Sequence, residues 1–333
     1  MTHNLDERLK NGLLIFDGAM GTEIYKRNYF INTCFDELCL SAPDIIKEIH
    51  TSYFEAGADV LTANSYGANR NKLSKFGLAE KLVEINMKAV QLARDVGGDT
   101  AMVAGSVGPL GRNDSPVLLK EKDAIGILSE HALALEKAGA DFIIFETIPT
   151  LQEAHYAFRA AQMLSIPYML SFAVDRSGES SNGEPLSKLL TAIGPEGHHP
   201  SAIGINCGLG PEGALTVLEQ LVKLSRYPII VQPNAGMPKN VEGRMIYMAS
   251  PEYFSTYALR FINLGARGIG GCCGTTPEHI RDTARVVRPV ARSAGSSQLS
   301  FIKEAEKSLE PVPLERKSSF GAKLKSDKWL TSV

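Results

Sequence analysis

Short apolar runs rich in β-branched residues recur along the chain at intervals long enough to hold a helix, and this alternation constrains the fold more than any other feature. Most of the runs are followed by Gly, Asn, Pro or Thr. Eight can be counted: LLIF from Leu13, DVLTA from Asp59, AMVAG from Ala101, FIIFE from Phe142, YMLSFAV from Tyr168, AIGINC from Ala202, PIIVQP from Pro228 and RGIGGC from Arg267. We therefore predict eight strands joined by helices.

Helical patterns fill the intervals, with apolar residues three and four positions apart. They include APDIIKEIHTSYFEA from Ala42, KLVEINMKAVQLAR from Lys81, GILSEHALALEKA from Gly126, GALTVLEQLVKL from Gly213 and PEYFSTYALRFINL from Pro251. Eight βα units in one chain predict an α/β fold of the (β/α)8 TIM-barrel type. An open doubly wound sheet has the same alternation of elements, so it remains the alternative.

Local signals agree with a repeated αβ unit. In EAGADVLT, KAGADFII and NLGARGIG a Gly ends a helix and the chain enters a strand directly, and Gly suits the left-handed position after a helix. Capping boxes at Ser41 to Asp44 and at Thr275 to Glu278 predict two helix starts.

The pattern changes after about Ser293. AGSSQ is a polar break of small residues, and the segment from Ser300 to Val333 mixes opposite charges with two prolines and has no strong periodicity. We predict two parts: a barrel domain over 1–294, and a linker or appended tail over 295–333.

Composition narrows the classes of function. Hydrophobic residues make up 44% of the chain, which is enough apolar material for a large core. A net charge of −2 without a dense cluster of Lys and Arg disfavours a nucleic-acid partner and favours a small-molecule substrate. The N-terminal residues lack a signal-peptide pattern and no apolar run is long enough to span a membrane, so we expect a cytoplasmic protein without a membrane partner.

Polar and reactive residues stand where the predicted strands end, which is the functional face of a barrel. They are Asp17 after the first strand, Asn64 after the second, Gly105 and Ser106 after the third, Glu146 and Thr147 after the fourth, Asn206 and Cys207 after the sixth, Asn234 after the seventh, and Cys272 and Cys273 after the eighth.

The cysteines carry the most specific chemical signal. Five cysteines, an odd number in a chain without an export signal, argue for free thiols. Cys207, Cys272 and Cys273 close strands that only one strand separates in a barrel, so we expect their sulfurs to converge. Three thiolates with one open position match a catalytic zinc site. Burial of the same residues as small apolar side chains is the alternative.

Glycines flank the cysteine pair. Gly270, Gly271 and Gly274 are expected to supply the unusual backbone angles that aim two adjacent side chains at one metal.

A zinc site of three thiolates suits a thiol substrate, because a metal deprotonates a thiol whose free pKa is about 8.5. Asp17 and Glu146 are predicted to hold the ammonium of an amino-acid substrate, and backbone N–H groups around Gly18 and Ala19 its carboxylate. In the structural alternative, Asp17 is a turn residue and Glu146 caps a helix.

Three other motifs are weaker signals. Gly208, Gly210 and Gly213 form GxGxxG after a strand, but the next strand ends in QPNAG, where a dinucleotide site needs an acidic residue. His198 and His199 lie in a polar loop and are expected to be exposed. The SVGPLG loop at 106–111 either contacts a phosphate-bearing or folate-like donor or is a plain barrel turn.

DGAMGT at 17–22, NCG at 206–208 and GGCCGT at 270–275 together strongly resemble the motifs of the homocysteine S-methyltransferase family. The likeness runs from about Leu13 to about Val290. Over this range the chain resembles the homocysteine-binding module of cobalamin-dependent methionine synthases. The same module occurs in bacterial bifunctional proteins that join it to a methylenetetrahydrofolate reductase. The spaced cysteine pattern is highly specific, and DGAMGT alone is less so.

The resemblance implies zinc-dependent transfer of a methyl group to the thiolate of L-homocysteine, which forms methionine. Cys207, Cys272 and Cys273 match the zinc ligands of the family, and Asp17, Gly18, Ala19 and Glu146 match positions that hold homocysteine. Asn234 matches a residue that occupies the open zinc position until substrate displaces it.

The methyl donor and the partners stay open. The resemblance implies S-methylmethionine, S-adenosylmethionine, or methylcobalamin or methyl-folate as donor. PVPLERKSSFGAKL and KWLTSV in the tail resemble the linker and reductase opening of the bifunctional proteins, which implies a methylenetetrahydrofolate reductase domain or partner. The alternative function is a non-catalytic zinc- and homocysteine-binding module that works only with a separate cobalamin, folate or reductase partner.

Overall fold

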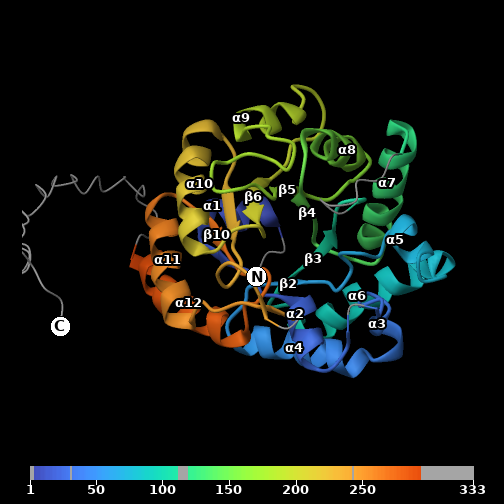
Figure 1. The fold of residues 1–333 in the computed structure, drawn as a ribbon, viewed down its shortest axis with the longest axis horizontal. Coiled ribbons are helices and arrows are strands. Elements are labelled where there is room, and N and C mark those ends of the chain that lie inside the picture. The colour runs from blue at the N-terminus through green and yellow to red at the C-terminus, as the bar shows by residue number, and fades with distance from the viewer. Residues whose placement is uncertain (1–3, 31, 112–118, 242–243, 294–333) are drawn as a thin grey trace, which may run out of the picture. The chain divides into compact units, whose positions relative to one another are not determined.

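A computed structural model describes residues 4–30, 32–111, 119–241 and 244–293. Eight parallel strands form a central sheet that helices surround (Figure 1). They are β1 (Leu14–Ile15), β2 (Val60–Thr62), β3 (Met102–Val107), β4 (Phe142–Ile148), β5 (Tyr168–Phe172), β6 (Ala202–Asn206), β7 (Ile229–Gln232) and β10 (Gly268–Ile269). Each of the eight predicted runs overlaps one of these strands, and β3 and β4 extend two residues beyond theirs.

Helices connect the strands and cover the outer side of the sheet (Figure 1). The longer ones are α4 (Pro43–Glu55), α6 (Leu82–Gly97), α7 (Glu121–Lys137), α8 (Leu151–Ala161), α10 (Pro211–Leu224), α11 (Pro251–Asn263) and α12 (Pro277–Ser293). The short ones are α1 (Leu5–Asn11), α2 (Met20–Lys26), α3 (Leu38–Ser41), α5 (Arg70–Ser74) and α9 (Leu186–Leu189), with 3-10 turns η1 (Ala79–Lys81) and η2 (Leu190–Ala192). All five helices predicted from apolar spacing are present.

The sheet closes on itself. Its order is β1-β10-β7-β6-β5-β4-β3-β2, and the two end strands meet where Phe16 bridges Val60 in parallel. Asp17 donates its N–H to the Val60 carbonyl at 3.1 Å, and Asp59 donates its N–H to the Ile15 carbonyl at 2.6 Å. The predicted (β/α)8 barrel is therefore confirmed, because an open doubly wound sheet would leave β1 and β2 as separate edges.

One end of the barrel is filled from inside. The interior holds Leu14, Phe16, Val60, Met102, Ala104, Phe142, Ile144, Met169, Ala202 and Ile230, all buried. Leu5 and Leu9 of α1 belong to the same cluster, so this helix plugs the end where the strands begin. The opposite end, where the strands finish, is left for a site.

In two of the repeated Gly-Ala-Asp segments, the aspartate links neighbouring strands. Asp59 accepts the N–H of Ile15 in the neighbouring strand at 2.9 Å, and Asp141 accepts that of Val103 at 2.6 Å. Each carboxylate also pairs with an arginine, Asp59 with Arg288 and Asp141 with Arg94. The carboxylates therefore bind the start of one strand to the next.

The two predicted helix starts are confirmed, but the capping boxes expected there do not form. Helix α4 begins after Ala42, which has no side-chain cap, and the Ser41 hydroxyl donates to Glu37 instead. Helix α12 begins at Pro277, while the Thr275 hydroxyl donates to the Cys272 carbonyl at 2.7 Å. Thr275 serves the strand-end loop and not the helix.

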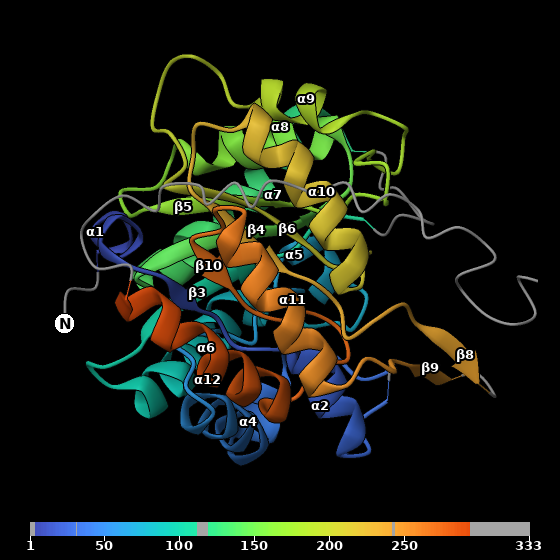
Figure 2. The ribbon, with the colours of Figure 1, turned by 90° about the vertical axis from the view of Figure 1, so that its left-hand side faces the viewer.

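A small hairpin, β8 (Lys239–Val241) with β9 (Arg244–Ile246), projects from the connection between β7 and α11 (Figure 2). Among the described residues, no helix combines the length and the apolar character needed to cross a membrane. The tail predicted over 295–333 lies outside the described residues, and the boundary at 294 stays a prediction.

Asp59→Ala is expected to lower the free energy of unfolding by about 1–3 kcal/mol, because it removes the acceptor of a strand N–H at the seam that closes the barrel. Urea denaturation measures the change. Asp95→Ala, at an exposed position of α6, is the matched control and should change stability by less than about 0.5 kcal/mol. Equal effects of the two substitutions would contradict the role of Asp59 at the seam.

Candidate active site

Three thiols meet at the open end of the barrel. The sulfur atoms of Cys207, Cys272 and Cys273 all lie within 4.8 Å of one another, and those of Cys207 and Cys273 are 4.0 Å apart. Cys207 directly follows β6, and the other two follow β10. No other group of three His, Cys, Asp or Glu residues with this spacing occurs in the part of the chain that the structure describes.

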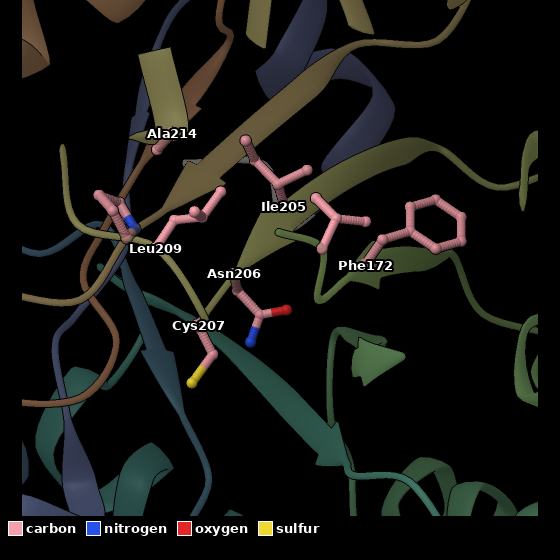
Figure 3. A pocket seen from close by; sticks show the side chains of 8 residues that line it. Phe172, Ile205, Asn206, Cys207, Leu209 and Ala214 are labelled. Atoms are coloured by element: carbon pink, nitrogen blue, oxygen red, sulfur yellow. The ribbon is translucent and has the colours of Figure 1, made fainter. Parts of the chain in front are cut away.

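Cys207 reaches the cluster through its backbone. In β6, Ile203 and Ile205 face the helices, so regular alternation turns Asn206 toward the inside of the barrel. Cys207 has a φ of 57°, in the left-handed region that residues other than Gly rarely adopt. Figure 3 shows the side chains of Asn206 and Cys207 leaving the chain on the same side. Two consecutive residues thus face the mouth.

Of the three glycines around the cysteine pair, Gly274 has the predicted unusual backbone angle, whereas Gly270 and Gly271 have a different role. Only Gly274 has a positive φ, at 81°, whereas Gly270 and Gly271 do not. A Cβ at Gly271 would lie 2.3 Å from the Thr275 hydroxyl oxygen, and one at Gly270 would lie 2.6 Å from Cβ of Phe16. These two positions need Gly because neighbouring side chains pack directly on the backbone.

Tyr247 is a site residue that the sequence did not reveal. It lies just beyond β9, and its ring rests on Gly274, where a Cβ would come within 2.3 Å of it. Its hydroxyl is within hydrogen-bonding reach of the Cys273 thiol, and burial raises the pKa of that hydroxyl above its ordinary value. No sequence pattern links the end of a hairpin to a cysteine 26 residues later.

Glu146 enters the mouth from β4. Its carboxylate accepts hydrogen bonds from the hydroxyl of Ser106 and from Nδ2 of Asn206, the latter at 3.1 Å. Burial, opposed by the Ser106 hydrogen bond and assisted by the negative charge of Cys207, raises the pKa of Glu146 to about 7. The group lies within β4, so the alternative role as a helix cap is excluded.

Asp17 lies at the end of β1 and is only 3% exposed. Its carboxylate accepts two hydrogen bonds from Thr62, one from the backbone N–H and one from the hydroxyl, both at 2.7 Å. Burial raises the pKa of Asp17 to about 7, against the lowering effect of the two Thr62 hydrogen bonds and with a smaller contribution from the charge of Glu146. A buried and a half-buried carboxyl group that interact, with no basic partner bonded to either among the described residues, are suited to a cationic ligand.

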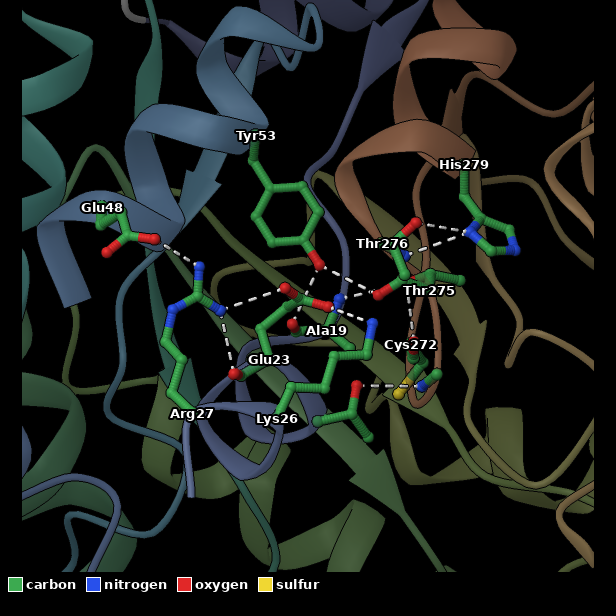
Figure 4. Close-up of polar contacts among 12 residues, drawn as sticks. Ala19, Glu23, Lys26, Arg27, Glu48, Tyr53, Cys272, Thr275, Thr276 and His279 are labelled. Atoms are coloured by element: carbon green, nitrogen blue, oxygen red, sulfur yellow. Dashed lines mark hydrogen bonds and ion pairs between the residues drawn. The ribbon is translucent and has the colours of Figure 1, made fainter. Parts of the chain in front are cut away.

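The loop after Asp17 is held by a buried tyrosine (Figure 4). The Tyr53 hydroxyl lies 2.9 Å from the Ala19 carbonyl and 3.0 Å from that of Thr275. The N–H of Ala19 donates to the Thr275 hydroxyl at 3.1 Å and is therefore already used. A Cβ at Gly18 would lie 2.7 Å from the Tyr53 ring, so only Gly fits there.

Asn234 is 2% exposed, and its side chain is within hydrogen-bonding reach of Cys207. Its Oδ1 is buried and has no hydrogen-bond partner among the described residues, which is costly for an amide oxygen. Three thiols at this spacing, with the amide of Asn234 adjoining Cys207, are a donor set that suits a tetrahedral metal ion. The residues present thus fit a zinc ion.

The thiols share their protons unequally. Hydrogen bonds from Cys272 and Cys273 lower the pKa of Cys207, and the resulting negative charge holds the pKa values of the other two thiols high. The cluster can therefore already carry a thiolate, the form in which cysteine binds metals.

A small apolar hollow adjoins Cys207 (Figure 3). It is lined by Phe172, Val174, Ile205, Asn206, Cys207, Leu209, Ala214 and Pro233.

Farther out, Tyr66 is 39% exposed and within hydrogen-bonding reach of Thr147, with the Lys72 ammonium 4.5 Å from the centre of its ring. The mouth therefore has an aromatic residue at its rim.

The weaker motifs lie apart from this chemistry. His198 is exposed and His199 bonds Tyr227, so neither joins the thiol cluster. In the SVGPLG loop, Gly108 donates its N–H to Tyr66, and Leu110 and Gly111 donate theirs to Glu153. These N–H groups are engaged and do not form an open phosphate cradle. The GxGxxG segment runs from the end of β6 into the first turn of α10, within a barrel and not a dinucleotide-binding sheet.

Comparisons with known proteins agree with one another. A family model described as homocysteine S-methyltransferase matches residues 14–287. The methionine synthase of Mycobacterium tuberculosis is 30% identical over 93% of this chain, and that of Mycobacterium leprae is 31% identical over 85%. The chain spans only about a quarter of the length of these two relatives, 27% and 25%.

Other relatives match along most of their length. The homocysteine S-methyltransferase YbgG of Bacillus subtilis is 30% identical, over 83% of this chain and 95% of that protein. Among solved structures, the metallated form of the Escherichia coli homocysteine methyltransferase MmuM has a TM-score of 0.71 and 27% identity, over 83% of this chain and 97% of that one. Its oxidized form has the same TM-score and identity and covers 82% and 95%.

We compare the free energies of unfolding of Glu146→Gln and of the unaltered chain, both without metal. The difference is expected to shift in favour of Glu146→Gln as the pH rises from 5 to 8. The raised pKa means that the folded chain binds more protons than the unfolded chain between about 4.5 and about 7, so stability falls as pH rises through this window. Gln does not titrate, and the Ser106 hydroxyl can reverse its hydrogen bond to suit it. Urea midpoints at both pH values measure the difference; a difference that does not change with pH would contradict the raised pKa.

Proposed function

Because the chain belongs to the homocysteine S-methyltransferase family, we propose that it transfers a methyl group to the sulfur of L-homocysteine and forms methionine, with a zinc ion held by Cys207, Cys272 and Cys273. The observation that carries the proposal is the convergence of three thiols within 4.8 Å at the open end of the barrel. Bound zinc would keep the acceptor sulfur in its thiolate form at neutral pH.

The chain supplies the rest of the acceptor site. Asp17 and Glu146 lie at the ends of two strands on the same face and would hold the ammonium group of homocysteine. The backbone N–H of Gly18 has no protein acceptor among the described residues and would meet the carboxylate, whereas that of Ala19 would first have to leave Thr275. Asn234 would fill the open metal position until the acceptor sulfur replaces it.

The reaction forms one S–CH3 bond and breaks the bond between the methyl group and its donor. The proton of the acceptor thiol passes to solvent when the thiolate forms, before the transfer, so the thioether product is neutral at sulfur. Product formation thus removes the negative charge that holds the acceptor sulfur in the site, which favours release. The residues of the barrel position the acceptor and keep its sulfur at the mouth, where a donor can approach.

The donor and the partners are part of the proposal. The relatives include stand-alone methyltransferases and much longer methionine synthases, so S-methylmethionine, S-adenosylmethionine and methylcobalamin or methyl-folate all stay candidates. A methylenetetrahydrofolate reductase domain or partner, a cytoplasmic location, and the division into a barrel over 1–294 and a tail over 295–333 are also proposed. The alternative, a zinc- and homocysteine-binding module without its own turnover, has the same site.

Assays with each donor separate these two functions. Zinc-loaded protein is expected to form methionine from homocysteine with at least one of S-methylmethionine, S-adenosylmethionine and methylcobalamin. Homocysteine binding without product from any of them would favour the non-catalytic module. Absence of binding as well would contradict the proposed function.

Cys207→Ser is expected to abolish methyl transfer and to lower the bound zinc, because it removes one of three metal ligands. Metal analysis after dialysis gives the zinc content per chain. Cys34→Ser is the matched control, since Cys34 is a buried free thiol outside the cluster, and should keep zinc and activity. Turnover retained by Cys207→Ser would remove the metal from the mechanism.

Asn234→Ala is expected to weaken zinc binding in the absence of homocysteine and to leave it nearly unchanged when homocysteine is present. The reason is that Asn234 occupies the fourth position only in the resting state. Competition with a chromophoric chelator, with and without homocysteine, measures both affinities. An equal loss in the two conditions would contradict this role.

A further inference from the structure

A residue with a strained backbone, Thr147, is held by the side-chain amide of Asn206. Among described residues other than Gly, only Asn28, Thr147 and Cys207 have a positive φ. Thr147 has a φ of 59°, which is a marked outlier for a β-branched residue and costs of order 1–3 kcal/mol. The side chain of Asn206 bonds Thr147 twice, accepting its N–H at 2.8 Å and donating to its hydroxyl at 2.8 Å.

The strain at Thr147 belongs to a β-bulge. Phe145 pairs with Leu170 and Ile148 with Phe172, so β4 has one residue more than β5 between these pairs. Phe145 and Ile148 both pack in the layer under the helices. Glu146 and Thr147 therefore both turn toward the mouth, where a regular strand would send only one of them.

The amide of Asn206 is fully used at this bulge. Its Oδ1 accepts from the Thr147 N–H and from the Ser171 hydroxyl at 2.7 Å, and its Nδ2 donates to the Thr147 hydroxyl and to the Glu146 carboxylate. Asn206 is 2% exposed, and Nδ2 also lies 4.0 Å from the sulfur of Cys272. A carboxylate at this position would lack both donors.

We propose that Asn206 is a positioning residue that clamps the β4 bulge and thereby directs Glu146 at the ammonium group of the acceptor. The inference rests on the proposed function, because it assigns the group that Glu146 holds. Asn206 itself touches neither the amino group nor the donor. Its removal would release Thr147 toward ordinary backbone angles and turn Glu146 away from the mouth.

Two ligands separate this role from a general effect on the thiols. The first is homocysteine, and the second is 4-mercaptobutanoate, which has the same thiol and carboxylate but no amino group. In zinc-loaded protein followed by calorimetry, Asn206→Ala is expected to weaken homocysteine binding roughly tenfold or more and to change 4-mercaptobutanoate binding by less than about twofold. An equal loss for both ligands would overturn the inference but leave the proposed function intact.

Failure of the proposed function gives a different result. If the unaltered chain binds 4-mercaptobutanoate as tightly as homocysteine, no group recognises the ammonium and the inference is overturned. If it binds neither, the proposed function is overturned with it. Should Asn206→Ala not fold, Ser171→Ala removes one hydrogen bond from the same amide and should give a smaller loss that is again selective for homocysteine.

A rescue experiment tests the clamp directly. Gly adopts a positive φ without steric cost, so Thr147→Gly in the Asn206→Ala background should recover roughly threefold or more of the lost homocysteine affinity. A double variant that binds no better than Asn206→Ala would contradict the clamp. The matched control is Gln162→Ala, which removes an amide with three hydrogen bonds to Phe158 and His198 far from the thiols and should leave both ligands unaffected.

Discussion

The left-handed backbone of Cys207 is the constraint on which the thiol cluster depends. At a φ of 57°, the residue after an inward-facing asparagine also faces inward, and its sulfur comes within 4.8 Å of both Cys272 and Cys273. Such a conformation costs about 1–3 kcal/mol in a residue other than Gly, and it persists only when the surroundings over-determine it. Here the N–H of Cys207 donates to Gln232 in β7 and its carbonyl accepts from Leu209. The strained backbone of Cys207 thus places its thiol in the cluster.

Pairs of consecutive side chains that face the mouth occur at three strand ends. Strands β4, β6 and β10 each deliver two consecutive side chains, Glu146 with Thr147, Asn206 with Cys207, and Cys272 with Cys273. Alternation along a strand sends neighbours to opposite faces, so each pair needs a local departure from regular geometry. The barrel can tolerate these departures because its other end is closed by α1 and its seam by Asp59, away from the site.

The sequence predicts the barrel and the thiol cluster because both depend on periodic or spaced patterns. Eight β-rich runs are visible in the residues, and three cysteines at strand ends follow from counting them. The number of strands alone could not predict that the barrel closes. Closure depends on the contact between Phe16 and Val60, which joins the two end strands of the sheet. The role of Gly270 and Gly271 could not be predicted for a similar reason. The side chains of Phe16 and Thr275 leave no room for a Cβ at these positions, and only tertiary packing brings those side chains near. Tyr247 and the clamp of Asn206 on Thr147 are likewise products of tertiary contact. Asn206 and Thr147 stand out in the sequence only as polar residues at strand ends.

The most direct test of the central claim is the coordination of the metal itself. X-ray absorption spectroscopy of the zinc-loaded protein should give three sulfur neighbours at about 2.3 Å and one nitrogen or oxygen neighbour. Addition of homocysteine should convert this to four sulfur neighbours. Fewer than three sulfur neighbours in the resting protein, or no fourth sulfur with homocysteine, would contradict the account.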